Sequence, residues 1–473
     1  MAIHNMVIER FIGLDQSTDE SMIASGCTAE AINFDTDGGS LSVCRGFEPV
    51  CTYPIPGSEP VQRLYVFKQP AKDILIAITG GVVYAYAGGS GGWQSIYDYG
   101  VSGVNQHYCC VTAQIGTEDY LLIADGSSQI IKYDGESVTL FGSAEGCSDI
   151  ACNYIDMYRG RLFAAGDSEH PNRLYYSMLP GDDRSIENWG YYPASPSVEG
   201  GHVEIGETCG DPITGVYAMS NQLLIFKRNS LYRLLGDRPG NFTVERMAGE
   251  CERTASAAVC VHNDVVYYLT KHGLHSFNGV EAAPMPDMRR IRRLMEGASI
   301  TQSRMTFAGD KLYFSVTTGG RSRLIVYDLT ERKYLAYGGF TVYDLGMTED
   351  APLIVSGTRR VCEWGRGGSF DGAAIEASWR TPLTDLGDGS TVKTLRQLYL
   401  RGEGSGDVTV KTRVGGVTDS YRAALPETYD GVVELPLKNE GRTLCITFEN
   451  RDGGAFTLAC GVQLEISVRR RTE

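Results

Sequence analysis

Short hydrophobic runs, each broken by polar turn residues, recur along most of the chain. In residues 210–247 the runs "QLLIFK" and "SLYRLL" are separated by "RNS", and residues 236–240, "GDRPG", end the second run. Runs of about 4–7 β-prone residues bounded by Asn, Gly, Asp and Pro are hairpin signals. None of these runs reaches the roughly 10 residues of a typical helix. The pattern therefore predicts an all-β chain.

Units of this kind repeat roughly every 40–50 residues. Most have a first strand, a turn at Gly or Asn-Asp, an apolar second strand, another turn, and a third strand with a Tyr near its end. The units occupy residues 63–96, 108–142, 154–179, 210–247, 254–285, 302–338 and, as a partial unit, 342–365. Repeated small sheets of this length are typical of a β-propeller, in which each blade buries its faces against its neighbours. We expect a propeller of six or seven blades over residues 40–365.

A propeller usually closes by completing one blade from both ends of the chain. The segment "SLSVCRGFEPV", residues 40–50, is the expected N-terminal strand of the last blade. Residues 1–39 are then an extended N-terminal arm or entry segment. After the linker "GRGGSFDG" the sequence pattern changes to longer strands with alternating apolar and polar residues. Residues 369–473 have the size of a C-terminal β-sandwich.

One segment departs from the strand pattern. In "MPDMRRIRRLMEG", residues 285–297, apolar residues fall at helical spacing with arginines between them. One interpretation is a short amphipathic helix that caps a blade and exposes a solvated basic face. The other is a contact surface for an acidic neighbouring subunit or for phosphate. The candidate inter-subunit contacts are Arg289, Arg290, Arg292 and Arg293.

The net charge of the chain bears directly on the partners that it can bind. The formal net charge is −15 over 473 residues. A non-specific nucleic-acid binder must neutralise phosphates and is expected to be basic. The excess of acidic residues therefore argues against adhesion to DNA. An acidic surface also has a simpler explanation, because it keeps a protein soluble.

The cysteines predict no framework of disulfides or metal ligands. The 13 Cys are scattered, and no C-x-x-C occurs, so the usual zinc spacing is absent. We expect reduced, semi-buried thiols in a cytosolic environment, with a few disulfides as the alternative. The N-terminal residues lack a basic region followed by a long apolar core, so neither a signal peptide nor a membrane span is predicted.

Motifs of catalysis are not found. The sequence has no G-x-S-x-G elbow, no H-E-x-x-H and no phosphate-binding Gly-rich loop. His272 and His275 are close together but straddle a turn, and we expect turn and strand residues there, with a metal or proton site as the alternative. Asp35 and Asp37 alternate as in a calcium loop, but the remaining ligands are missing and a hairpin turn is expected. We expect no catalytic residue, cofactor or metal.

Three segments resemble the propeller proteins of tailed bacteriophages that join head to tail and form the tail nozzle or packaged-DNA stabilisation hub. The first is residues 23–50, which is similar to the family's entry pattern. The positions that fill that pattern are Asn33, Asp35, Gly39, Leu41, Arg45 and Gly46. The Pro that the family often has between the Arg and the Gly is absent. The second segment contains "FKRNSLY" and "GLHSFNG", and the third is the C-terminal domain from "SWRTPL" onward.

The resemblance implies a structural virion protein and no enzyme. It implies a homo-oligomeric ring, commonly a hexamer, that lies below the portal and adaptor proteins, contacts other tail proteins, and retains and conducts the DNA genome through its axis without sequence-specific binding. The expected location is the virion tail, assembled in the host bacterial cytoplasm and not in a membrane. The alternative is a carbohydrate- or receptor-binding propeller, because Tyr and Trp suit stacking on sugars. An enzyme is the third interpretation, since propeller sites are assembled from loops far apart in sequence.

Overall fold

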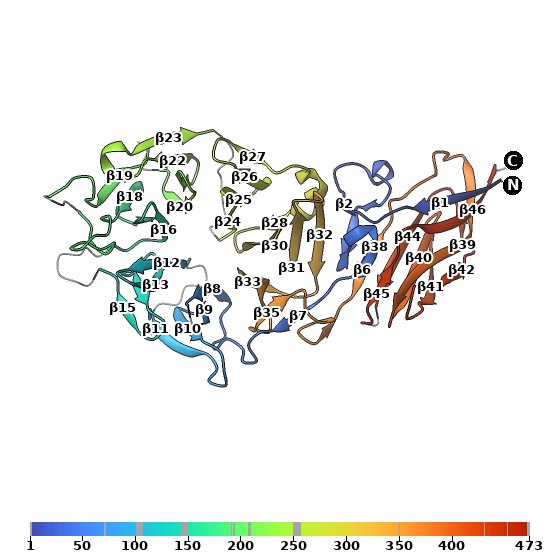
Figure 1. Cartoon of the computed structure of the whole chain (residues 1–473). Coiled ribbons are helices and arrows are strands. Elements are labelled where there is room, and N and C mark those ends of the chain that lie inside the picture. Colours follow the sequence, from blue (N-terminus) through green and yellow to red (C-terminus); the bar gives the residue numbers. More distant parts are fainter. Residues whose placement is uncertain are drawn as a thin grey trace.

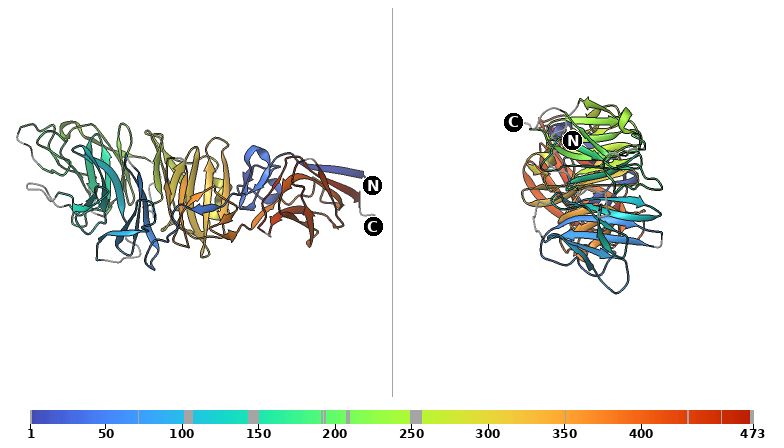
Figure 2. Two further views of the ribbon diagram at one scale, coloured as in Figure 1. Left: turned by 60° about the horizontal axis from the view of Figure 1, so that its bottom comes forward. Right: turned by 90° about the vertical axis from the view of Figure 1, so that its left-hand side faces the viewer.

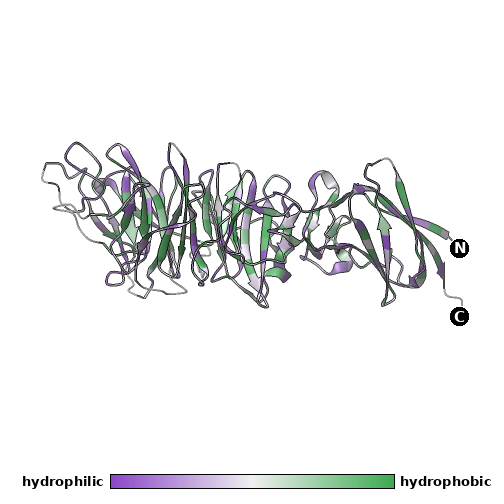
Figure 3. Cartoon of the chain, turned by 90° about the horizontal axis from the view of Figure 1, so that it is seen from below, coloured by the Kyte–Doolittle hydropathy of each residue, from purple (hydrophilic) through white to green (hydrophobic). Residues whose placement is uncertain are grey.

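The computed structural model describes residues 2–70, 72–100, 107–142, 150–190, 192, 194–206, 210–248, 257–349, 351–429, 431–451 and 453–470. The chain is elongated, and the N- and C-terminal ends lie together at one end of it (Figures 1 and 2). Apolar residues concentrate within the sheets and polar residues in the connecting loops (Figure 3). The all-β expectation is confirmed. No helix in the described ranges is long and apolar enough to cross a membrane.

Five four-stranded antiparallel sheets follow one another along the chain, each in simple sequence order. The first contains β8 (Val61–Lys68), β9 (Asp73–Thr79), β10 (Val82–Tyr86) and β11 (Gln94–Asp98). The second contains β12 (Cys109–Ile115), β13 (Glu118–Ala124), β14 (Ile131–Tyr133) and β15 (Val138–Leu140). The third contains β16 (Tyr154–Tyr158), β17 (Arg161–Ala165), β18 (Arg173–Tyr176) and β19 (Gly201–Glu204). The fourth contains β20 (Ile213–Ala218), β21 (Leu223–Lys227), β22 (Leu231–Leu235) and β23 (Thr243–Met247). The fifth contains β24 (Val259–His262), β25 (Val265–Thr270), β26 (Gly273–Phe277) and β27 (Ala282–Pro284).

Two larger sheets continue the series. The sixth contains β28 (Ala298–Ser299), β29 (Met305–Ala308), β30 (Lys311–Thr318), β31 (Arg321–Asp328) and β32 (Lys333–Gly338). The seventh contains β33 (Val342–Met347), β34 (Pro352–Ser356), β35 (Val361–Trp364), β7 (Phe47–Pro49), β36 (Ser369–Phe370) and β37 (Ala373–Ala374). The pairing of β7 with β35 confirms that the segment 40–50 supplies a strand to the last of these sheets. Only the end of the segment does so, because β6 (Leu41–Val43) pairs within the larger C-terminal sheet instead. The strands β36 and β37 follow the expected boundary at residue 365 and still extend this sheet.

Local turn chemistry explains the hairpins. Asn263 and Asp264 join β24 to β25, and both have positive φ, at 49° and 62°. Two consecutive residues of this kind form the type I′ turn whose twist matches that of the flanking strands. Asn and Asp tolerate the left-handed region better than other non-glycine residues, so the "HNDV" segment folds back on itself.

Buried side chains fill the spaces between consecutive sheets. The second strands are apolar on both faces, as in β21, where all five residues are buried, because each sheet is covered on both sides. One cluster joins the fourth sheet to the fifth through Phe226 and Tyr268, with ring centroids 4.9 Å apart. Another joins the first sheet to the seventh through Leu64 and Leu353. The strands β8 and β33 accordingly lie side by side (Figure 1).

The C-terminal residues form two further sheets that share one core. The larger contains β1 (Ala2–Ile8), β46 (Val462–Arg470), β39 (Thr391–Gly404), β45 (Phe456–Leu458), β6 (Leu41–Val43) and β5 (Phe34–Asp35), with β42 (Val432–Pro436) and β43 (Glu440–Gly441) also paired to β39. The smaller contains β4 (Glu30–Ile32), β38 (Ala377–Arg380), β44 (Leu444–Asn450), β40 (Asp407–Val414) and β41 (Val417–Ala424). Residues 1–39, expected as an N-terminal arm, contribute β1, β4 and β5 to these sheets.

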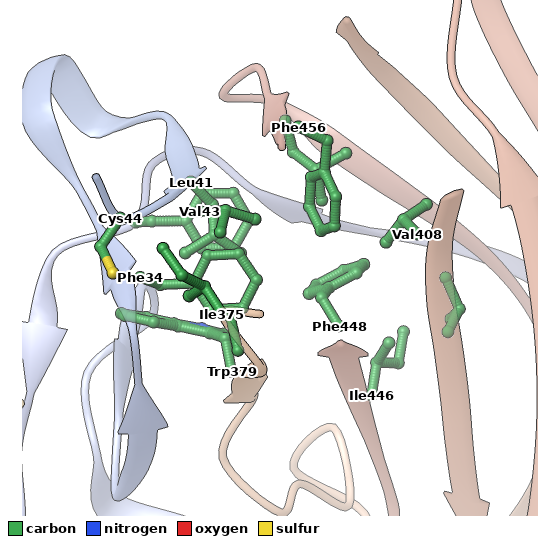
Figure 4. Packing of buried hydrophobic residues seen from close by; sticks show 14 of the residues in the cluster. Phe34, Leu41, Val43, Cys44, Ile375, Trp379, Val408, Ile446, Phe448 and Phe456 are labelled. Atoms are coloured by element: carbon green, nitrogen blue, oxygen red, sulfur yellow. The ribbon is translucent and has the colours of Figure 1, made fainter. Parts of the chain in front are cut away.

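The N-terminal segment packs deeply into this core. Phe34, Leu41 and Val43 lie against Trp379, Phe448 and Phe456 (Figure 4). The Phe34 and Phe456 rings are 5.8 Å apart. The same cluster includes Leu324 and Tyr337 of the sixth sheet. One apolar core therefore continues from the small sheets into the C-terminal pair.

Short elements complete the fold. The strands β2 (Gly13–Leu14) and β3 (Cys27–Thr28) pair in parallel. The 3₁₀ helices are η1 (Glu20–Met22), η2 (Asp37–Gly39), η3 (Pro239–Asn241) and η4 (Met288–Ile291). The α-helix α1 (Arg292–Met295) follows η4. The helix expected within residues 285–297 is therefore present but is limited to one 3₁₀ turn and one α-helical turn.

Candidate functional site

The basic segment formed by η4 and α1 is docked on the N-terminal part of the same chain. Ile291 and Leu294 are buried, as the helical spacing predicted. The backbone N–H of Leu294 donates to Oε1 of Gln16 at 3.2 Å, and the N–H of Gln16 donates to the carbonyl of Arg290 at 2.9 Å. The apolar side of the segment is thus covered within the protomer, which leaves its arginines at the surface.

Two of the four candidate arginines have intramolecular partners outside their own short helix. Arg293 forms an ion pair with Glu20 at 3.0 Å. Arg290 lies 3.9 Å from Asp287 and donates to the carbonyl of Arg332 at 3.3 Å. Both side chains help to hold the segment against its own chain.

The other two arginines face solvent. Arg292 pairs with Glu296 one turn later at 3.2 Å, and both side chains are more than half exposed. Such a pair contributes little to stability because water screens it. Arg289 is exposed and forms no ion pair with a residue that the structure describes. Of the four, Arg289 and Arg292 are thus the most available to a neighbouring subunit.

The histidine and aspartate motifs singled out in the sequence lie in a buried strand and in a hairpin. His275 lies in β26, is buried, and packs on Tyr268 with ring centroids 5.6 Å apart. Residues 34–40 form the expected hairpin between β5 and β6. Burial raises the pKa of Asp35, which accepts a 2.6 Å hydrogen bond from the Tyr337 hydroxyl. Within the described ranges, no three His, Cys, Asp or Glu side chains gather in a way that could hold a metal ion.

The described cysteines are poorly suited to nucleophilic chemistry. All ten are free thiols, and Cys460 alone among them is exposed. Burial raises the pKa of both Cys110 and Cys362 to about 12. A thiol that stays protonated at neutral pH is a weak nucleophile. Cys110 and Cys362 therefore act as small apolar residues of the core.

Buried carboxylates tie neighbouring sheets together. Asp344 on β33 accepts the backbone N–H of Leu64 on β8 at 2.5 Å and pairs with Arg304 at 3.1 Å. Asp156 on β16 accepts the N–H of Ala218 on β20 at 2.7 Å. In both cases an aspartate on the first strand of one sheet satisfies an amide on the first strand of another. These carboxylates therefore hold neighbouring sheets together.

A cleft of about 1050 Å³ lies where the sixth and seventh sheets meet the C-terminal sheets. Its lining includes Arg321 and Arg323, which follow the turn between β30 and β31. Residues two apart on a strand point to the same side. Neither arginine forms an ion pair with a described residue, while Arg451 in the same cleft pairs with Glu449 at 2.6 Å. The sequence did not single out this cleft, because it is assembled from segments far apart in the chain.

Comparisons with known proteins give no family for this chain. No family model and no curated protein matches it. Among solved structures, PorZ, a bacterial surface component of the type-IX secretion system of Porphyromonas gingivalis, is 14% identical with a TM-score of 0.38, over 78% of this chain and 46% of its own. Two structures of the extracellular domain of BT4673 from B. thetaiotaomicron are 13% and 10% identical, with TM-scores of 0.40 and 0.41. They cover 82% and 95% of this chain and 47% and 63% of their own. This chain thus spans less than two thirds of each of these proteins, and at such low similarity we draw no function from them.

Proposed function

We propose that the seven small sheets form a seven-bladed β-propeller and that the two C-terminal sheets form a β-sandwich. The contact between the first and seventh sheets supports closure of the ring. The strand β7, which the N-terminal segment supplies to the last sheet, supports the same closure from both chain ends. The shared core of the two C-terminal sheets supports the sandwich.

We further propose that the protein is a structural component of a tailed-bacteriophage virion. It forms an oligomeric ring, a hexamer, that serves as a tail nozzle or hub below the portal and adaptor proteins. The ring retains the DNA genome and conducts it through its axis without sequence-specific contacts. The protein assembles in the host cytoplasm, where its thiols stay reduced, and then resides in the virion tail.

The observation that carries this proposal is the way the N-terminal segment unites the two halves of the chain. The Asn33 side chain donates to the carbonyls of Gly338 and Glu376 at 3.0 and 2.7 Å, and its Oδ1 accepts the Gly338 N–H at 2.8 Å. One residue thus links the sixth sheet to the C-terminal sheets. An elongated body held together in this way suits a component that supplies surfaces and transmits force.

The charge supports the same role. The net charge of −15 disfavours adhesion to the phosphate backbone. A conduit for DNA must let the duplex pass, so a weakly binding surface is suitable. The buried aspartates described above hold neighbouring sheets together.

The mass of the native protein tests the proposal. Sedimentation equilibrium of the purified full-length chain should give about six times the 51.6 kDa of the protomer. A species of one protomer mass at every concentration, including after addition of the portal complex of its source, would contradict a ring-forming role.

A further inference from the structure

The strand β1 is a long, unprotected edge of the larger C-terminal sheet. It pairs with β46 along all seven residues without a register shift. No described strand pairs with its other edge. The row of unpaired backbone N–H and C=O groups on such an edge is a template for another strand.

Natural proteins usually protect edges with charge, proline or short length. The last strands of the five four-stranded sheets follow this rule. Asp98, Glu204 and Glu245 lie in β11, β19 and β23, and β15 and β27 have only three residues each. The sequence of β1, "AIHNMVI", contains no Asp, Glu, Lys, Arg or Pro. The strand β1 therefore lacks the usual protection of an exposed edge.

The strand β42 forms the edge of the larger C-terminal sheet that lies opposite β1. The order β1–β46–β39–β42 is antiparallel at every step. Within the described residues, β39 is the only strand that pairs with β42, and β41 of the smaller sheet lies near it. The strands β1 and β42 consequently run in opposite directions. The β1 strand of a second copy, placed beside β42 in the same orientation, would continue the antiparallel pattern.

Both edges expose apolar side chains on the outer face of the sheet. In β1, Met6 and Ile8 face the core, while Ile3 and Val7 are 67% and 42% exposed. In β42, Leu435 is buried, Val432 is 54% exposed, and the exposed Glu434 shares the outer face with Val432. Alternation along a strand puts Ile3 and Val7 on one face and Val432 on the matching outer face. Pairing of the two edges would bring these apolar side chains together.

We propose that β1 of one copy adds to β42 of the next copy, so that the larger C-terminal sheet continues from protomer to protomer. This inference rests on the proposed ring. Pairing between two different edges is a head-to-tail contact, which gives a ring when the rotation between copies closes and an open filament when it does not, whereas pairing of β1 with itself stops at two copies. Pro436 at the end of β42 lacks an N–H and limits the ladder to the residues before it.

Placing lysines on the edge tests the pairing. The Ile3→Lys/Val7→Lys variant should need at least about tenfold more protein for half-assembly, a change of about 1.4 kcal/mol. Its thermal unfolding should match that of the wild-type protomer, because both side chains are exposed. The matched control is Val50→Lys/Val280→Lys, which adds the same charge at residues that are 40% and 73% exposed. Assembly by this control should equal that of the wild type.

The outcomes separate this inference from the proposed function. If the wild type forms rings and the edge variant forms them equally well, strand addition is overturned and the ring stands. If the wild type stays monomeric at every concentration, both are overturned. Loss of assembly in the edge variant alone supports the pairing.

Cross-linking identifies the partner edge. Two chains are prepared with Cys460→Ser, one carrying Val432→Cys and the other carrying Ile3→Cys, Asn5→Cys or Val7→Cys. Oxidation of the mixed and reassembled chains should give a disulfide-linked dimer, because directly opposite Cβ atoms lie about 4.5–5.5 Å apart. The Cys460→Ser chain and each variant alone should give none. A dimer formed by the β1 variants alone would overturn the head-to-tail pairing.

Discussion

At the scale of single residues, Asp156 gives a pH-dependent link between sheets. It accepts the N–H groups of Met157 and Ala218 at 2.8 and 2.7 Å. Burial raises its pKa from an ordinary 3.8 to about 6, although these hydrogen bonds oppose the shift. The folded protein therefore binds a proton more tightly than the unfolded chain does. The stabilisation by that proton is complete below about pH 4 and is lost as pH rises through about 6.

We expect the Asp156→Asn variant not to show this loss of stability as the pH rises. Between pH 4 and pH 7 the free energy of unfolding of the wild type should fall by about 1–3 kcal/mol relative to that of the variant, since one pKa unit corresponds to about 1.4 kcal/mol. Urea unfolding of both proteins across this range measures the difference. If the free energies of unfolding of the two proteins change in parallel with pH, Asp156 provides no pH-dependent link between the sheets.

Gly46 lies at the crossing of two segments far apart in the sequence. Its N–H donates to the carbonyl of Gly367 at 3.2 Å, and a Cβ at this position would overlap the carbonyl oxygen of Ser369. Gly46→Ala should therefore lower the free energy of unfolding by about 1–3 kcal/mol, the usual cost of overpacking.

The matched control for this variant is Gly368→Ala, in the loop between β35 and β36 that Gly46 contacts. A Cβ at Gly368 meets no atom within 4 Å. Its effect should stay within about 0.5 kcal/mol, as for ordinary surface substitutions. Equal unfolding midpoints for the two variants in urea would refute the crowding at Gly46.

At the scale of elements, hairpins were predictable and strand partners across the chain were mostly not. The "HNDV" turn and the strand pairs around it follow from residues next to one another. The strand β7 was expected in the last sheet because a propeller needs closure. By contrast, β1 and β6 pair with strands more than 400 residues away, β46 and β45. Nothing in their local pattern specifies such partners, since alternation fixes a buried face but not the strand alongside.

The helical spacing in the sequence located the basic segment and predicted that its apolar side is buried. Ile291 and Leu294 are the buried positions. The division of the arginines into paired and solvent-facing side chains was not predictable, because Glu20, the partner of Arg293, and Arg332, whose carbonyl accepts from Arg290, lie in other parts of the chain. The cleft with Arg321 and Arg323 was missed for the same reason. The adjacent turn "GG" marks the hairpin but not the cleft beside it.

Changing Arg289, Arg290, Arg292 and Arg293 to Ser should weaken ring assembly without unfolding the protomer. The apolar side of the segment, with Ile291 and Leu294, is unchanged in this variant. Circular dichroism should therefore match the wild type while sedimentation shifts toward smaller species. Unchanged ring formation would exclude these arginines from the interface. The single changes Arg289→Ser and Arg293→Ser compare a solvent-facing arginine with one that is paired inside the protomer.

At the scale of the whole molecule, the account describes a rigid, elongated building block with two ends of different character. One end carries the loops of the small sheets, and the other carries both chain termini and the edge strands β1 and β42 (Figures 1 and 2). The apolar core continues between them. Such a protomer has room for one set of contacts around a ring and another along an axis.

Electron microscopy of the purified protein, alone and mixed with the portal complex of its source, tests the central claim most directly. The account predicts rings or tubes of six protomers with an axial channel wide enough for duplex DNA, about 20 Å across. Single, unassociated protomers in both samples would contradict it.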